Sequence, residues 1–406
     1  WYRIFSFPDH THFNLASQED PKRHSDMWRA VGPGYTMQNV NKTEPFMDEC
    51  ITLLRCQLMV LALRGQPVDF DKWFTFLSLD VVGQATFSTR LGYLDTGRDV
   101  GLAISTVKIV AAYTAIMGQF TWLHDLTLGN LLLGKLGIQP HVKMMGICKP
   151  IIKARKENPS PRRDMMAELL AMQAKFPDKV KDFDIENAAQ LNIAAGAEGG
   201  FILHCIFSIL SNQKLTTGGV TQAFVYHLLR NPKHLKRLRA EIDEANAKGE
   251  LSSVAQFTET QKLPFLQACI KETYRMYCPI GVGMPRVVPD GRRTICSKYF
   301  VGGTILNINS YAIHRYPKIF GADTNTFNPE RWLSIDDEEY KRMERNLVHW
   351  GAGYNKCAGH HLSHFQMCKV TATLLRDFDF GQICPEKEWV QPHGWPCWVK
   401  ARGQVS

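Results

Sequence analysis

The chain has 406 residues, of which 45% are hydrophobic, and its formal net charge is +9. This length exceeds what one compact core usually supports, so we expect two domains or one large domain with a minor lobe. Because the basic residues are spread along the sequence, nucleic-acid binding is not indicated. A basic face that meets an acidic protein or an anionic membrane surface stays open.

The cysteines favour a reducing compartment. There are 11 of them, an odd number, and no two are spaced Cys-x-x-Cys. A chain this long needs no disulfides, so free thiols are expected. No apolar stretch is long enough to span a bilayer, since the longest, residues 201–210, is short and contains His204. The chain begins at Trp1 and reads as a fragment, so a missing signal or anchor says nothing about the natural protein.

Helical patterns fill the first half of the sequence. Asp20 before Pro21 is a good helix start, and the helix it opens carries His24 and Arg29. Apolar residues then recur with a period near 3.6 from Pro45 to about Arg64 and from Phe70 to Ser88, which predicts two core helices. Residues 98–180 continue mainly helical, with breaks at Gly129 and at the prolines 159–161.

The helical pattern from Asp184 to Gly200 becomes rich in small residues at its end. Its last part reads Ala194-Ala195-Gly196-Ala197-Glu198-Gly199-Gly200. Small side chains allow a flat cofactor or a bound gas to approach a helix closely. The alternative is an ordinary helix packed tightly on a neighbour.

A later helix carries a pair of opposite charges. Glu272 and Arg275 lie three residues apart, so they share one face and can pair. Most such pairs lie on the surface, but apolar residues surround this one. Residues 285–308 then alternate like a small sheet, with turns at Asp290-Gly291 and Gly302-Gly303.

One loop combines a cysteine with glycines. Residues 350–359 read Trp-Gly-Ala-Gly-Tyr-Asn-Lys-Cys-Ala-Gly, and a helix-forming run follows. Gly351 and Gly353 allow a tight hairpin, and Gly359 leaves room for a flat ligand. Cys357 would lie at the helix N-terminus, which favours a thiolate and thus a soft-metal ligand. A small buried cysteine after a turn is the alternative.

The aromatic-Gly-x-Gly-x-x-x-Cys-x-Gly pattern resembles the haem-binding loop of the cytochrome P450 family. The resemblance covers nearly the whole chain and is strongest in residues 262–380. It implies haem b with iron bound by the Cys357 thiolate, which donates electron density that favours O–O cleavage. It also implies a mainly α fold with small β-sheets, one domain over residues 1–406, and a missing N-terminal anchor and first strands.

Family roles follow for several residues. In the family, residues at or next to the positions of His24, Arg29 and Arg286 bind the haem propionates. Two positions depart from the family pattern. Trp28 stands where one family arginine belongs, and Asn355 replaces the usual Arg or His of the loop. Glu272 and Arg275 match a buried Glu-x-x-Arg pair that a later arginine, here Arg331, joins. The pair would persist because it fixes the geometry of the loop under the haem.

The distal signature of the family is divided in this chain. Gly196 and Glu198 match its glycine and acid, but Gly199 stands where the threonine belongs. Joining Glu198 to Thr216 restores the signature, and a helical 199–215 would shift everything downstream by about 26 Å. We therefore expect 199–215 to be an insertion foreign to the fold, for example a retained intron. A loop insertion that the fold tolerates is the alternative.

The resemblance implies a monooxygenase, closest to microsomal-type fungal members. It would insert one oxygen atom of O₂ into a small lipophilic substrate, with electrons from an NADPH-dependent flavoprotein reductase and protons relayed by Glu198 and Thr216 beside Gly196. The alternative is a haem protein with lost or altered oxygenase activity, either peroxide-using or rearranging. The location implied is the cytoplasmic face of the endoplasmic reticulum membrane, in secondary metabolism.

Overall fold

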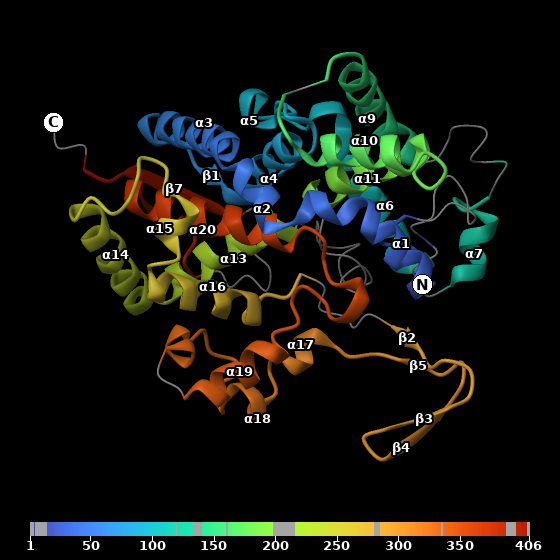
Figure 1. The fold of residues 1–406 in the computed structure, drawn as a ribbon. Coiled ribbons are helices and arrows are strands. Elements are labelled where there is room, and N and C mark those ends of the chain that lie inside the picture. Colours follow the sequence, from blue (N-terminus) through green and yellow to red (C-terminus); the bar gives the residue numbers. More distant parts are fainter. Residues whose placement is uncertain are drawn as a thin grey trace.

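The computed structural model describes residue 4 and residues 14–118, 120–130, 132, 140–159, 161–197, 216–279, 285–333, 336–386 and 395–403. Helices dominate these residues, and the strands are few and short (Figure 1). The predicted fold class, mainly α with small β-sheets, is confirmed.

The helices before residue 198 lie mainly in the upper part of Figure 1. They are α1 (Pro21–Val31), η2 (Gly32–Tyr35), α2 (Met37–Lys42), α3 (Glu44–Leu63), α4 (Phe70–Phe87), α5 (Tyr93–Thr96), η3 (Val100–Leu102), α6 (Ala103–Met117), α7 (Thr121–Leu126), α9 (Pro140–Glu157), α10 (Met165–Lys175) and α11 (Asp182–Ala197). The predicted start of α1 is confirmed, because the Asp20 carboxylate accepts hydrogen bonds from the backbone N–H groups of Lys22 and Arg23.

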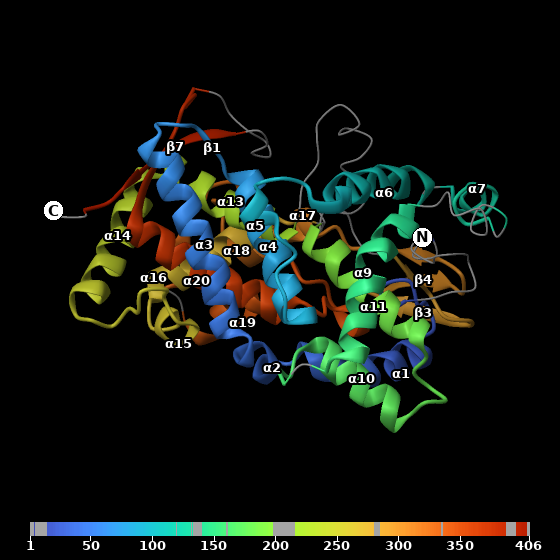
Figure 2. The same cartoon turned by 90° about the horizontal axis from the view of Figure 1, so that it is seen from above.

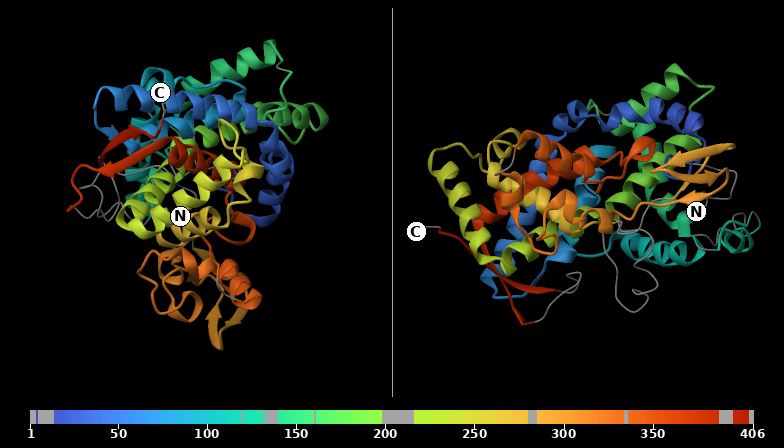
Figure 3. Two further views of the ribbon diagram at one scale, coloured as in Figure 1. Left: turned by 90° about the vertical axis from the view of Figure 1, so that its left-hand side faces the viewer. Right: turned by 90° about the horizontal axis from the view of Figure 1, so that it is seen from below.

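The later helices complete the core and add a minor lobe. They are α13 (Thr216–Arg230), α14 (Pro232–Ala247), α15 (Phe257–Thr260), α16 (Pro264–Met276), α17 (Ser310–Ile313), α18 (Pro317–Phe320), η4 (Pro329–Trp332), α19 (Asp337–Asn346), η5 (Gly353–Asn355) and α20 (His360–Asp377). Seen from the side in Figure 3 (left), α17–α19 and the neighbouring strands extend below the main helical body.

Among the described residues, the strands form three small antiparallel sheets. In the first, β7 (Pro396–Ala401) lies between β1 (Val68–Asp69) and β6 (Phe378–Gln382). The other two are pairs, β2 (Arg286–Val287) with β5 (Ile305–Leu306) and β3 (Arg292–Ile295) with β4 (Lys298–Val301). Strands β2 to β5 all come from residues 285–308, so the prediction of a small sheet in this alternating stretch is confirmed.

Two buried helices organise the core. Nearly every residue of α4 is buried, and α4 packs against α3, α11 and α13 (Figure 2). A helix buried on nearly all sides belongs to the interior of the fold. Most of α20 is buried as well, and its fully buried Lys369 forms ion pairs of 2.6 Å with Glu44 and 2.8 Å with Asp48 of α3. The helix that follows Cys357 is therefore fixed to the core.

Candidate active site

The loop from Trp350 to Gly359 closes on itself just before α20. Gly351 and Gly353 have φ angles of 75° and 74°, which residues with a side chain rarely adopt. The backbone N–H of Cys357 donates to the Trp350 carbonyl at 2.8 Å, and η5 lies between these two residues. The predicted tight turn is therefore confirmed.

Cys357 lies at the end of the glycine loop, directly before α20. It lies three residues before His360, the first residue of α20, and it is exposed. Even so, burial among the surrounding protein raises the pKa of its thiol, against the smaller lowering effects of a hydrogen bond from the Gly359 N–H and of the Lys356 charge. Metal binding there would release the thiol proton, because the thiolate is the ligand.

The surface around Cys357 fits a flat group. A Cβ atom added at Gly353 or Gly359 would meet no atom within 4 Å, so the backbone is uncovered at both positions. The Oδ1 atom of Asn355 is buried and has no hydrogen-bond partner within the described part of the chain. Together with the soft sulfur ligand, these features suit the proximal side of a haem.

Two of the three predicted propionate-binding residues meet at this loop. The buried His24 ring contacts the ring of Tyr354 edge-on, with centroids 5.1 Å apart. The Arg286 guanidinium lies 5.7 Å from the same ring and donates to the Ala352 carbonyl at 3.4 Å. Burial lowers the pKa of His24, so this ring is a neutral hydrogen-bond donor at pH 7.

Arg29 lies on another side of α1. Its guanidinium forms a 2.7 Å ion pair with Asp26, and both side chains are well exposed. The reason is helical geometry: Trp28 is four residues after His24 and shares its face, whereas Arg29 is turned by about 140° from His24. The structure thus brings His24 and Arg286 to the loop and places Arg29 on the outer surface.

The predicted charged triad on α16 is buried. Both oxygens of Glu272 accept from Arg275, at 2.7 Å and 2.9 Å, and both accept from the Arg331 Nε at 3.1 Å. The Trp332 indole and the Asn328 backbone N–H also donate to this carboxylate, at 3.0 Å and 2.8 Å. Glu272 and Arg275 are fully buried, so this is not a surface pair.

The Glu272–Arg275–Arg331 triad also holds the segment from His314 to Thr326, which precedes the cysteine loop in the sequence. Arg275 donates to the carbonyls of His314, Thr324 and Thr326 at 3.0 Å, 2.6 Å and 3.0 Å. Buried charges are tolerated only when their hydrogen-bonding capacity is used in this way. The network therefore fixes the chain between α17 and η4 to α16.

Tyr274 connects α16 to the cysteine loop. Its ring stacks on His349 with centroids 4.1 Å apart and contacts Trp350 at 5.4 Å. Its hydroxyl lies 3.1 Å from Nδ1 of His364 on α20. The helix with the triad, the loop and the helix after Cys357 thus form one packed unit.

The predicted distal residues are only partly described. Gly196 lies in the last turn of α11 and Thr216 begins α13, but Glu198 and the whole of 199–215 lie outside the described residues. The next residue, Thr217, donates its hydroxyl to Ser363 Oγ of α20 at 2.9 Å. The first turn of α13 is therefore close to the helix that follows Cys357.

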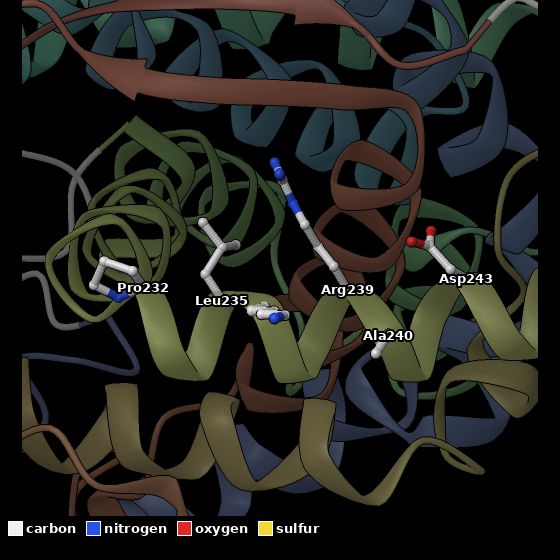
Figure 4. Close-up of a pocket in the computed structure, with 6 residues that line it drawn as sticks. Pro232, Leu235, Arg239, Ala240 and Asp243 are labelled. Atoms are coloured by element: carbon white, nitrogen blue, oxygen red, sulfur yellow. The ribbon is translucent and has the colours of Figure 1, made fainter.

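A hollow along α14 lies away from this site. It has a volume of about 380 Å³, and its lining residues all belong to α14 (Figure 4). Arg239 forms an ion pair with Asp379 of β6, and Asp243 forms one of 2.7 Å with Arg402. These charged groups stabilise the contact with the C-terminal sheet.

Comparison with known proteins agrees with the loop chemistry. The family model for cytochrome P450 matches residues 9–395. The chain belongs to the cytochrome P450 family. A cytochrome P450 monooxygenase of Aspergillus terreus is 30% identical over 91% of this chain and 73% of its own length. The cytochrome P450 monooxygenase cicH of Emericella nidulans is 31% identical over 96% of this chain and 75% of its own length.

Family membership decides the cofactor and the type of reaction. A cytochrome P450 holds haem through a cysteine thiolate, and Cys357 occupies the ligand position of the loop. The chain is accordingly a haem-thiolate monooxygenase, which requires a redox partner, an organic substrate and O₂.

Sequence reasoning missed two aromatic residues of this cytochrome P450. Tyr354 lies between His24 and Arg286, and Tyr35 of η2 stacks on Trp28 with centroids 6.1 Å apart. The Tyr35 hydroxyl donates to Oδ1 of Asn192 on α11. The position of Tyr354 within the loop was a usable signal, whereas nothing in the sequence connects Tyr35 with residue 192.

Proposed function

We propose that this cytochrome P450 oxidises a small lipophilic organic substrate, with electrons from an NADPH-dependent flavoprotein reductase. The observation that carries the proposal is Cys357, an exposed sulfur on a glycine loop that is fixed to α20 and α16. The haem, when bound, supplies the oxidative chemistry of O₂ activation. The protein supplies the iron ligand, the cofactor's orientation and the proton path.

The roles of the chain's own residues are as follows. Cys357 binds the iron, and the hydrogen bond from the Gly359 N–H reduces the negative charge on its sulfur. His24 and Arg286, which both contact Tyr354, would hold the propionates. The uncovered backbone at Gly353 and Gly359 would leave room for a flat group beside the loop.

Proton delivery is assigned to the distal helix. We place Glu198 and Thr216 there as the relay, with Gly196 opening space beside them for O₂. The supporting observation is that the first turn of α13 reaches α20 through Thr217 and Ser363. Replacing Thr216 by Val should raise NADPH consumption per product formed, because protons would reach the distal side less efficiently.

We further propose that 199–215 interrupts one continuous distal helix. Asn192 of α11 donates to Thr86 of α4 at 3.3 Å, and a Cβ at Gly218 of α13 would lie 2.9 Å from the Thr75 backbone nitrogen. Along α4, these two contact points are roughly 16 Å apart. A continuous helix from Asn192 to Gly218 would span about 39 Å, but about 14 Å without 199–215.

The shorter span fits α4, so the contacts of α11 and α13 favour an insertion over a helix that continues through 199–215. Sequencing the transcript tests its origin. If every full-length transcript contains the codons for 199–215 and no spliced form lacks them, the segment is not a retained intron.

The electron donor and the membrane are also part of the proposal. Exposed Lys356 next to Cys357 gives the proximal face a positive charge, which suits an acidic reductase surface. In the described part of the chain, no helix is long and apolar enough to cross a membrane. The endoplasmic reticulum is proposed from the resemblance to microsomal-type members, and fractionation of the source cells tests it.

Two measurements separate the proposed activity from altered chemistry. A red-shifted Soret band of the ferrous carbon monoxide complex reports the thiolate ligand. NADPH consumption with a flavoprotein reductase, coupled to product formation, reports monooxygenation. Product formation from peroxide alone, or substrate rearrangement without NADPH, would favour the alternative. A screen for substrate-induced Soret shifts then identifies the substrate class.

A further inference from the structure

A buried tyrosine and a histidine are paired between α16 and α20, two helices that pack against each other. The Tyr274 hydroxyl lies 3.1 Å from Nδ1 of His364, and the tyrosine is only 4% exposed. Haem binding uses Tyr274 for packing, and the distal proton path does not involve it. The chemistry that this hydrogen bond allows is therefore still to be assigned.

The hydrogen bond of this pair has a defined direction at pH 7. Burial raises the pKa of Tyr274 well above its ordinary value, so the phenol keeps its proton. Burial lowers the pKa of His364 to about 4, and the charge of Lys271 adds to this effect, so the imidazole is neutral. Tyr274 therefore donates to Nδ1, and the ring proton is on Nε2, which lies 3.6 Å from Sγ of Cys368.

The pair lies one side chain away from the cysteine loop. The Tyr274 ring contacts the Trp350 ring edge-on, with centroids 5.4 Å apart, and stacks on His349 at 4.1 Å. The Trp350 carbonyl in turn accepts from the backbone N–H of Cys357 at 2.8 Å. An electron that leaves the phenol thus needs to cross a single aromatic ring to reach the loop that carries the iron ligand.

A phenol is easily oxidised only when a base takes its proton at the same time, because the radical cation of a phenol is a strong acid. The 3.1 Å between the Tyr274 hydroxyl and Nδ1 of His364 lies within the roughly 2.6–3.2 Å over which a base takes a proton directly. Tyr35, by contrast, donates to the amide oxygen of Asn192, which is not a base. Tyr274 therefore combines a contact with the loop and a proton acceptor.

We propose that Tyr274 and His364 form a redox pair that removes one oxidising equivalent from the haem when no substrate is bound. Tyr274 gives one electron, through its contact with Trp350, to a haem that a peroxide or peracid has oxidised, and gives its proton to Nδ1 of His364. The products are a neutral phenoxyl radical, an imidazolium and a haem reduced by one electron. One electron from a thiol, together with the proton returned by His364, restores the pair. The step depends on haem at Cys357 but not on the proposed substrate or reductase.

The test uses the full, haem-loaded chain without substrate, which is mixed with peracetic acid, frozen rapidly and measured by electron paramagnetic resonance. We expect a tyrosyl radical, identified by a narrower signal when the chain is made with ring-deuterated tyrosine. In the natural chain, electron–nuclear double resonance should also show a solvent-exchangeable proton hydrogen-bonded to the phenoxyl oxygen, donated by His364. Absence of the tyrosyl radical or of this proton would overturn the proposal.

Three variants locate the radical. Tyr274→Phe removes only the hydroxyl and should lower the radical yield at least tenfold. His364→Gln keeps a hydrogen-bond acceptor but removes the base, so it should lower the yield at least fivefold.

Tyr113→Phe is the matched control. The Tyr113 hydroxyl lies 2.9 Å from Nδ1 of His124 on α7, which is at the edge of the molecule, away from α16 and α20 (Figures 1 and 2). This variant should keep the full yield. An unchanged yield in Tyr274→Phe, or an equal loss in Tyr113→Phe, contradicts the proposal. A red-shifted ferrous carbon monoxide band in every form shows that the haem site is intact, and neither reductase nor substrate enters the measurement.

Discussion

The proximal and distal sides of the haem site are held together by different contacts. On the proximal side, α16, the cysteine loop and α20 are joined by the Glu272 network, by Tyr274 and by the Cys357–Trp350 hydrogen bond. On the distal side, α11 and α13 each pack against α4, and Thr217 of α13 donates to Ser363 of α20. Because cofactor binding depends mainly on the first side and turnover on the second, the two activities can be separated experimentally.

The largest effect is expected from Cys357→Ala. The variant loses the sulfur ligand, so it should lack the red-shifted ferrous carbon monoxide band completely. Cys296→Ala, at an exposed cysteine in the β3–β4 hairpin, is the control and should keep the band. A red-shifted band in Cys357→Ala would refute the ligand assignment.

Glu272→Ala should nearly abolish the folded, haem-loaded protein. It leaves Arg275 and Arg331 buried without their carboxylate, which typically costs about 3–5 kcal/mol. Denaturant unfolding and haem content measure the loss. Glu338→Ala removes an exposed i,i+3 partner of Lys341 and should change stability little. Equal effects of the two substitutions would show that burial of the triad contributes nothing.

Acid should weaken the proximal side through His314. This fully buried ring accepts from the Val348 backbone N–H, and burial lowers its pKa to about 4 from 6.5. A lowered pKa in a base favours the neutral folded form, so this contribution is complete above pH 6.5 and is lost toward pH 4, amounting to roughly 3 kcal/mol.

His314→Gln keeps an acceptor for Val348 but does not titrate. Unfolding free energies between pH 7.5 and pH 4.5 should therefore fall less steeply in this variant than in the natural chain. Parallel pH profiles for the two proteins would count against the neutral buried histidine.

The smallest effect concerns the propionates. Arg286→Ala removes a guanidinium beside Tyr354 and should speed haem loss severalfold, measured by transfer to an apoprotein acceptor. Arg29→Ala removes an exposed arginine paired with Asp26 and should leave the rate unchanged. If Arg29→Ala sped haem loss more than Arg286→Ala, the propionates would bind on the outer side of α1.

Contiguous patterns predicted much of this molecule. The N-cap at Asp20, the helices α3 and α4 and the glycine turn before Cys357 depend on neighbouring residues, so the sequence displays them directly. The Glu272–Arg331 contact came from family resemblance. The side on which Arg29 lies and the Tyr35–Asn192 hydrogen bond depend on how distant helices rotate and pack, which no local pattern specifies.

The most direct test of the contrast between the two sides compares the full chain with a form that lacks 199–215. Both are expressed identically, and haem content, the ferrous carbon monoxide spectrum and NADPH-dependent turnover with a flavoprotein reductase are measured on each. Our account predicts the red-shifted band in both forms, because the proximal side is the same, and faster coupled turnover in the shortened form, whose distal helix is rejoined. Equal haem content together with equal turnover in the two forms would contradict it.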